Sequence, residues 1–145
     1  MGKVFAGDVD LALARSTIKR KTDARTTEAT MQYMLLIYDA EGRKMSPEEQ
    51  GKLFQEYMAF TQGIVKAGKF KAGDPLEPTS TATTVRVRNA KTLTTDGPFA
   101  ETKEQLGGYY IVEAENLDEA VAIAAGIPGA RTGSIEVRPI MKMHT

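Results

Sequence analysis

YMLLIY, at residues 33–38, is a nearly continuous apolar run of strand length, typical of a central strand that is covered on both faces. The next patterned stretch begins with Ser46 and Glu49, which are spaced as a capping box. Apolar residues then recur at helical spacing until Gly68, which suits a left-handed C-cap. The sequence therefore predicts a central strand followed by a helix over residues 46–67.

Two kinds of segment follow this helix. Residues 70–78 are interrupted by Gly and Pro, so they predict only a short strand that enters a loop. Residues 84–88 alternate Thr or Arg with Val, which predicts a half-buried strand. A turn at residues 89–91 leads into residues 92–95, and the two strands together predict a hairpin.

The C-terminal third supplies another strand, helix and strand. After a turn-rich linker at residues 96–108, residues 109–114 have the β-branched and aromatic composition of a core strand. The two glycines that end this linker favour a bulge over a phosphate site, because a strand and not a helix follows them. A second helix, capped by Asn116 or Asp118, ends near Gly126, and an edge strand that alternates Ile and Val with Glu and Arg follows.

The predicted order of elements, with the hairpin set aside, is β-α-β-β-α-β. This is the ferredoxin-like α+β arrangement, in which two helices cover one face of an antiparallel sheet. The opposite face would be uncovered in a monomer, and a second copy of the chain is the economical way to cover it. We therefore expect a homodimer in which the two sheets face each other.

The composition excludes several classes of function. There is no Cys, so disulfides, thiolate metal sites and a cysteine nucleophile are excluded. No apolar run approaches the roughly 20 residues of a membrane span, and the N-terminus lacks a signal-peptide core. Residues 31–145 carry thirteen Lys and Arg against fifteen Asp and Glu, so charge gives no reason to expect nucleic-acid binding. We expect a cytoplasmic protein with neither membrane nor nucleic acid as a partner.

Residues 1–30 differ from the rest of the chain. They combine a short apolar stretch, a basic cluster at residues 19–21 and a Thr-rich exit, which together bury little surface and predict a disordered extension. A cloned extension or a mis-assigned start explains this segment, and a native basic arm is the alternative. Residues 31–145 are expected to form the one folded domain.

Three segments resemble a known family: MQYMLLIY at residues 31–38, ATTVRVRN at residues 82–89 and TDGPFAETKEQLGGYY at residues 95–110. Together with SIEVRPI at residues 134–140, they resemble the DGPF group of the YCII-related family. The resemblance implies an α/β dimeric barrel and a cytoplasmic bacterial protein, in a family whose biochemical role is mostly uncharacterised. It implies a fold and not a reaction.

The sequence departs from the resemblance at one place. In YCII-like proteins proper, a helix His and an Asp near the second helix meet in a cleft as an acid–base pair. Here Tyr57 stands at the helix position of that His, and residues 127–131 contain no carboxylate. The DGPF group is also often encoded beside alternative sigma factors of the extracytoplasmic type, which supports a regulatory role as the alternative.

The DGPF segment holds the candidate catalytic residues. Asp96 is the candidate general acid or base, and Glu101 and Lys103 lie close to it in sequence. Two carboxylates around one ammonium, Glu101 and Glu104 around Lys103, can shift a pKa if the loop is partly buried. The alternative is structural, because Asp, Gly and Pro at residues 96–98 are turn formers and the Phe that follows can anchor a loop.

The candidate ligand-binding residues are Tyr57, Phe99, Glu104, Tyr109 and Arg86. Tyrosines in core elements mostly pack, and Tyr57 draws attention only through its position in the family pattern. Arg86 either binds an anion or pairs with a carboxylate on a neighbouring strand. No metal or cofactor is expected, since His144 has no second His or Cys to share a metal.

Two functions are therefore expected from the sequence. The first is a small-molecule site, catalytic or merely binding, in a cleft near the loop at residues 96–108. The second is a non-enzymatic dimeric module that takes part in regulation, with the DGPF segment as an architectural clasp.

Overall fold

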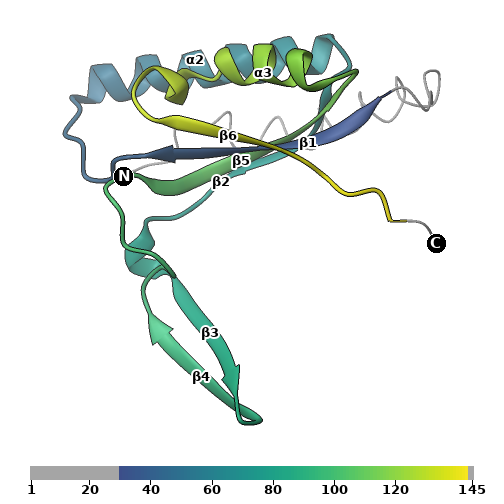
Figure 1. Cartoon of the computed structure of the whole chain (residues 1–145). Coiled ribbons are helices and arrows are strands. Elements are labelled where there is room, and N and C mark those ends of the chain that lie inside the picture. Colours follow the sequence, from purple (N-terminus) through teal and green to yellow (C-terminus); the bar gives the residue numbers. More distant parts are fainter. Residues whose placement is uncertain (1–29, 144–145) are drawn as a thin grey trace.

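The computed structural model describes residues 30–143. Helices α2 (Pro47–Lys66) and α3 (Leu117–Ala125) lie side by side on one face of a sheet, and no helix of the described residues covers its other face (Figure 1). The sheet order is β2-β5-β1-β6, and all neighbours are antiparallel. These strands are β1 (Met31–Asp39), β2 (Phe70–Pro75), β5 (Gln105–Ala114) and β6 (Ser134–Pro139). The predicted ferredoxin-like α+β fold is confirmed.

The ends of both helices follow from local chemistry. The Ser46 hydroxyl accepts a hydrogen bond from the backbone N–H of Glu49, whose carboxylate accepts one from the backbone N–H of Ser46, both at 3.1 Å. Gly68 ends α2 with φ of +74°, a conformation that costs least for glycine. Of the two predicted caps of α3, Asn116 and Asp118, the structure has Asn116, whose side chain accepts a hydrogen bond from the Glu119 N–H at 2.9 Å.

The hydrophobic core lies between the helices and the sheet. Its largest fully buried side chains come from the strands and from the segment after α3: Tyr110, Phe70, Leu35, Ile127 and Val112. The Tyr110 ring meets Phe60 of α2 edge-on, with centroids 5.2 Å apart. The Tyr110 hydroxyl shares a 2.7 Å hydrogen bond with the Thr61 hydroxyl, so the polar end of this ring is satisfied inside the core.

The strand β1 occupies the predicted central position, between β5 and β6. Its alternate residues Tyr33, Leu35 and Ile37 are buried under the helices. The residues between them point to the face without helices, where cover by a second chain stays a prediction. The strand β6 is an edge strand, as predicted.

Strand β5 begins at Gln105, four residues before the predicted start. The two glycines predict a linker at residues 105–108, but these residues pair with the end of β1 and with β2. The register shifts there, since Ile37 lies opposite Gly108 while Tyr38 lies opposite Leu106. The predicted bulge at this glycine pair is thus confirmed.

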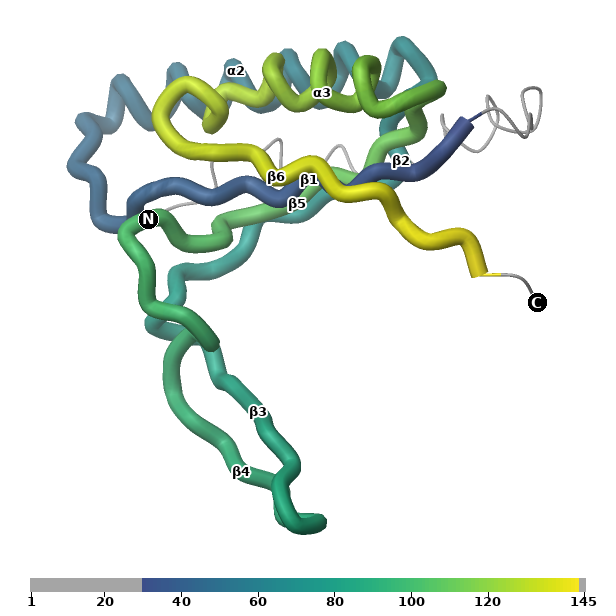
Figure 2. The backbone as a smooth tube through the Cα atoms, viewed as in Figure 1, coloured from purple at the N-terminus to yellow at the C-terminus, as the bar shows by residue number. Residues whose placement is uncertain are grey.

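The strands β3 (Thr83–Arg88) and β4 (Lys91–Asp96) form a separate two-stranded sheet, which we call the arm. Figures 1 and 2 show the arm projecting from the four-stranded sheet, on the side away from the helices. Its two-residue turn has positive φ at Asn89 and Ala90, the geometry of a type I′ hairpin. The predicted hairpin is confirmed, but the prediction of a half-buried strand is wrong. Val85 and Val87 are 59% and 60% exposed because no other element packs on the arm within the described residues.

No helix within residues 30–143 is long and apolar enough to cross a membrane. Apart from residue 30, the expected N-terminal extension lies outside the described residues, as does His144. The α/β barrel and the homodimer concern an assembly of two chains, and both stay predictions.

Candidate functional site

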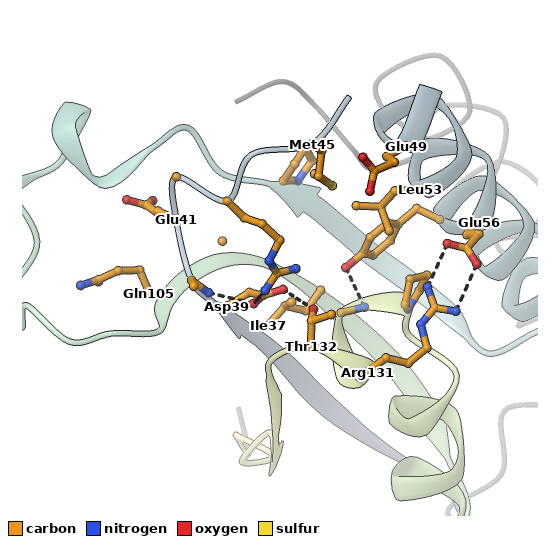
Figure 3. A pocket seen from close by; sticks show the side chains of 18 of the residues that line it. Ile37, Asp39, Glu41, Met45, Glu49, Leu53, Glu56, Gln105, Arg131 and Thr132 are labelled. Carbon is orange, nitrogen blue, oxygen red and sulfur yellow. Dashed lines mark hydrogen bonds and ion pairs between the residues drawn. The ribbon is translucent and has the colours of Figure 1, made fainter. Parts of the chain in front are cut away.

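A cavity of ≈ 930 Å³ lies between the first half of α2, the loop at residues 40–46 and the short 3-10 turn η2 (Pro128–Arg131). The ends of β2 and β5 near the base of the arm complete its wall. In Figure 3, Glu49, Leu53 and Glu56 approach from α2, while Asp39 faces them from the end of β1 and Thr132 from the turn that follows η2. A volume of this size lies within the range of about 300–1,000 Å³ that small-molecule sites occupy.

Asp39 organises one wall of this cavity. It is the last residue of β1, and its carboxylate accepts hydrogen bonds from the Arg43 guanidinium at 2.7 Å and from the Ala40 N–H at 2.8 Å. Its second oxygen accepts from the Thr132 hydroxyl, also at 2.7 Å. These bonds fix the loop after β1 and join it to the segment before β6.

Gly133 allows this close approach. A Cβ at this position would lie 2.0 Å from the backbone oxygen of Tyr38 and 3.0 Å from the Cα of Asp39. Real atoms do not tolerate such contacts, so only glycine fits where the chain passes the end of β1.

Tyr57 forms the floor of the cavity near η2. It lies in the middle of α2, is 3% exposed, and its hydroxyl accepts a 3.1 Å hydrogen bond from the Gly129 N–H. Burial raises the pKa of Tyr57 to about 12, and the negative charge of Asp39 acts in the same direction. The hydroxyl therefore keeps its proton at neutral pH. Gly129 is required here too, since a Cβ would lie 2.8 Å from the Tyr57 hydroxyl.

Two further carboxylates brace the rim. Glu56 forms a two-pronged pair with the Arg131 guanidinium at 2.9 and 3.1 Å, which joins α2 to η2. This hydrogen bonding lowers the pKa of Glu56. Glu41 accepts hydrogen bonds from both the N–H and the hydroxyl of Thr79, at 2.9 and 2.5 Å, which ties the loop to the 3-10 turn η1 (Thr79–Thr81) beside the arm.

The predicted catalytic residues lie outside this cavity wall. Asp96 ends β4, and Asp96, Glu101 and Lys103 are all exposed on the arm and on the loop that leaves it. Phe99 is 80% exposed, and the Arg86 guanidinium lies 5.5 Å from the centre of its ring. Their roles in catalysis and binding stay predictions.

The remaining predicted residues fall in three other places. Tyr57 lines the cavity. Glu104 accepts a 2.9 Å hydrogen bond from the Ser134 hydroxyl, which fixes the loop to the edge strand β6. Tyr109 alternates with the buried residues of β5, so it lies on the sheet face without helices, where its hydroxyl donates to Asp74 at 2.8 Å. The structure thus brings Arg86 and Phe99 together and separates the rest.

Most of the cavity wall could not be predicted from the sequence. Asp39 had a usable signal, because a carboxylate directly after a buried strand lies at the edge of a sheet, where sites form. Gly129, Arg131 and Thr132 had none, since their partners are 72 to 93 residues away in sequence. In the described residues, no group of three or more His, Cys, Asp or Glu side chains could hold a metal ion.

Residues 31–144 match the YCII-related domain. The chain belongs to the YCII-related family. An uncharacterized protein of Rhizobium meliloti (strain 1021) is 40% identical over 114 residues, which cover 76% of this chain and 92% of that relative. The family resemblance seen in the sequence is confirmed. In this YCII-related domain, Tyr57 contacts the segment at residues 127–131 through the Gly129 N–H. The carboxylate whose charge acts on the pKa of Tyr57 is Asp39, at the end of β1.

Proposed function

We propose that this YCII-related domain binds a small organic molecule in the cavity between α2 and η2. The observation that carries the proposal is the wall itself, which combines apolar side chains with a few fixed polar groups. Ile37, Met45 and Leu53 supply apolar surface, and Asp39 and Tyr57 supply hydrogen-bonding groups. This mixture is typical of sites for small molecules.

The polar groups of the wall are held before any ligand arrives. Asp39 is fixed by three hydrogen bonds, and Tyr57 is fixed by burial and by its bond to Gly129. Side chains that need no rearrangement lose little entropy on binding, which favours affinity. A reaction in this cavity would use the Asp39 carboxylate and the protonated Tyr57 hydroxyl as its polar groups.

The proposal is tested with N-phenyl-1-naphthylamine, a neutral dye that fluoresces strongly in apolar surroundings. We expect saturable binding to the wild-type protein and weaker binding in Leu53→Trp, because the larger ring takes up part of the apolar wall of the cavity. Leu117→Trp is the matched control, since Leu117 lies on the exposed side of α3, outside the cavity wall. A urea unfolding curve establishes that each variant is folded. Equal binding by wild type and Leu53→Trp would overturn the proposal.

We also propose that the domain forms a homodimer through the sheet face without helices. One observation supports this. Met34, Leu36 and Ile111 alternate with buried residues and so point to the sheet face that no helix of the described residues covers (Figure 1). A sheet face that carries several apolar side chains and has no covering layer is typical of a protein–protein interface. If the cavity binds nothing, such pairing favours the alternative function, a non-enzymatic interaction module.

Light scattering at micromolar concentration tests the dimer. We expect twice the monomer mass for wild type and the monomer mass for Leu36→Arg, which places a charge on the proposed interface. Lys52→Arg, on the opposite side of the domain, is the control and should leave the mass unchanged. A monomer mass for the wild type would contradict the proposal.

A further inference from the structure

The cavity is lined by four carboxylates and four cations, but these charges are not equally available to a ligand. Each carboxylate already accepts a hydrogen bond from a protein donor. Asp39 accepts from Arg43, Glu41 from Thr79 and Glu56 from Arg131. Glu49 accepts from the N–H of Ser46 in the capping box. Two of the four carboxylates are therefore paired with arginines, and the other two accept hydrogen bonds from neutral backbone and hydroxyl donors.

The four cations divide into two pairs. Arg43 and Arg131 form ion pairs with carboxylates of the wall, at 2.7 and 2.9 Å. The side-chain ammonium groups of Lys44 and Lys52 take part in none of the side-chain hydrogen bonds and ion pairs within residues 30–143, although the charge of Lys52 helps to lower the pKa of Glu56. Both lysines are exposed at the rim. The cationic side chains of the wall that have no ion-pair partner within residues 30–143 are therefore these two lysines.

We infer that the ligand is an amphipathic organic anion, such as a carboxylate or sulfonate on an apolar body. This inference rests on the proposed function and names the ligand class of the same cavity. The apolar body would pack against Ile37, Met45 and Leu53. The anionic group would stay at the rim beside Lys44 and Lys52, because full burial of a charge is costly while the rim is open to water. Lysine ammonium groups on long stems can follow such a group.

The experiment compares two dyes with the same apolar body. The neutral dye is N-phenyl-1-naphthylamine, and 8-anilino-1-naphthalenesulfonate adds one sulfonate to it. In the double variant Lys44→Gln/Lys52→Gln, we expect the dissociation constant of the sulfonated dye to rise by about threefold for each lysine, roughly tenfold in total, as for exposed ion pairs. The dissociation constant of the neutral dye should not change. Both substitutions are at exposed positions, so folding should be unaffected.

The matched control is Lys91→Gln/Lys142→Gln, which removes the same charge from the arm and from the segment after β6. It should leave the binding of both dyes unchanged. Added salt should weaken only the sulfonated dye, because screening acts on its charge.

The outcomes separate the two claims. If the neutral dye fails to bind the wild-type protein, the proposed function fails. If the neutral dye binds but the Lys44→Gln/Lys52→Gln variant binds the sulfonated dye as tightly as the wild type, only the inference of an anion fails. The inference also fails if the control variant weakens the sulfonated dye equally, because net charge would then explain the effect.

Discussion

The cavity and the arm are built in opposite ways. At the cavity, the contacts Tyr57–Gly129, Glu56–Arg131 and Asp39–Thr132 join residues 72, 75 and 93 positions apart. In the arm, β3 pairs only with β4 across a two-residue turn, and its apolar side chains are exposed. Charge and a compact motif mark the arm and its loop in the sequence, whereas the fixed polar groups lie at the cavity. A conspicuous motif therefore need not coincide with the cavity.

The largest effect should come from Gly133→Ala, which sharpens this comparison at the cavity end. The new Cβ would lie 2.0 Å from the backbone oxygen of Tyr38, and neither backbone segment can move without disturbing Asp39. We expect the free energy of unfolding in urea to fall by about 3 kcal/mol, the upper part of the range for overpacking.

Gly51→Ala is the control for Gly133→Ala. Gly51 lies within α2, and a Cβ there meets no atom within 4 Å. Alanine should stabilise the helix by up to about 1 kcal/mol. Equal effects of the two substitutions would show that the packing beside Asp39 is not tight.

Tyr57→Phe should have the next largest effect. It removes the acceptor of the Gly129 N–H, which is then buried without its partner, at a cost of about 1–3 kcal/mol in the free energy of unfolding.

On the arm, Val87→Ala should change the free energy of unfolding by no more than about 0.5 kcal/mol, because the side chain is exposed. Urea unfolding measures both. A larger cost at Val87 than at Tyr57 would reverse the comparison and indicate that a second chain packs on the arm.

The free energy of unfolding of the domain should fall gradually as the pH rises into the alkaline range. The pKa of Tyr57 is about 12 in the folded chain against an ordinary value of 10.0, and burial also raises the pKa of Tyr110. Above pH 10 the unfolded chain loses these protons first, so the unfolded state gains relative stability as pH rises. Each of these tyrosines should lower the free energy of unfolding by about 1.4 kcal/mol per pH unit between the two pKa values.

Urea unfolding curves between pH 8 and pH 12 measure this decline, with tyrosinate absorbance recorded in parallel. Below about pH 9 the tyrosines should contribute no pH dependence. In Tyr57→Phe the decline between pH 10 and pH 12 should be shallower than in the wild type. An unchanged slope in that variant would mean that the Tyr57 hydroxyl ionises as readily in the folded as in the unfolded chain.

Much of the fold could be predicted because its signals are local. The spacing of Ser46 and Glu49 defines the start of α2, and Gly68 defines its end. The alternation at residues 84–88 correctly predicted a strand. It could not tell whether any layer lies over Val85 and Val87, because exposure depends on the rest of the fold.

The site was harder to predict than the fold. Tyr57 was found only through its position in the family pattern, and Asp39 could have been found from its place after a buried strand. Gly129 and Thr132 bind partners that lie far away in the sequence, so no local pattern marks them. The candidates at Asp96 and Glu101 were chosen for their charge, which does not by itself create a cavity.

The most direct test of the account is a titration of the ¹⁵N-labelled protein with N-phenyl-1-naphthylamine, followed through its backbone amide NMR signals. This measurement locates the bound dye instead of only detecting it. We expect the largest shifts at residues 40–45, 53–57 and 129–132, around the cavity. Shifts confined to residues 83–104 would contradict this expectation, because they would place the site on the arm and the DGPF loop.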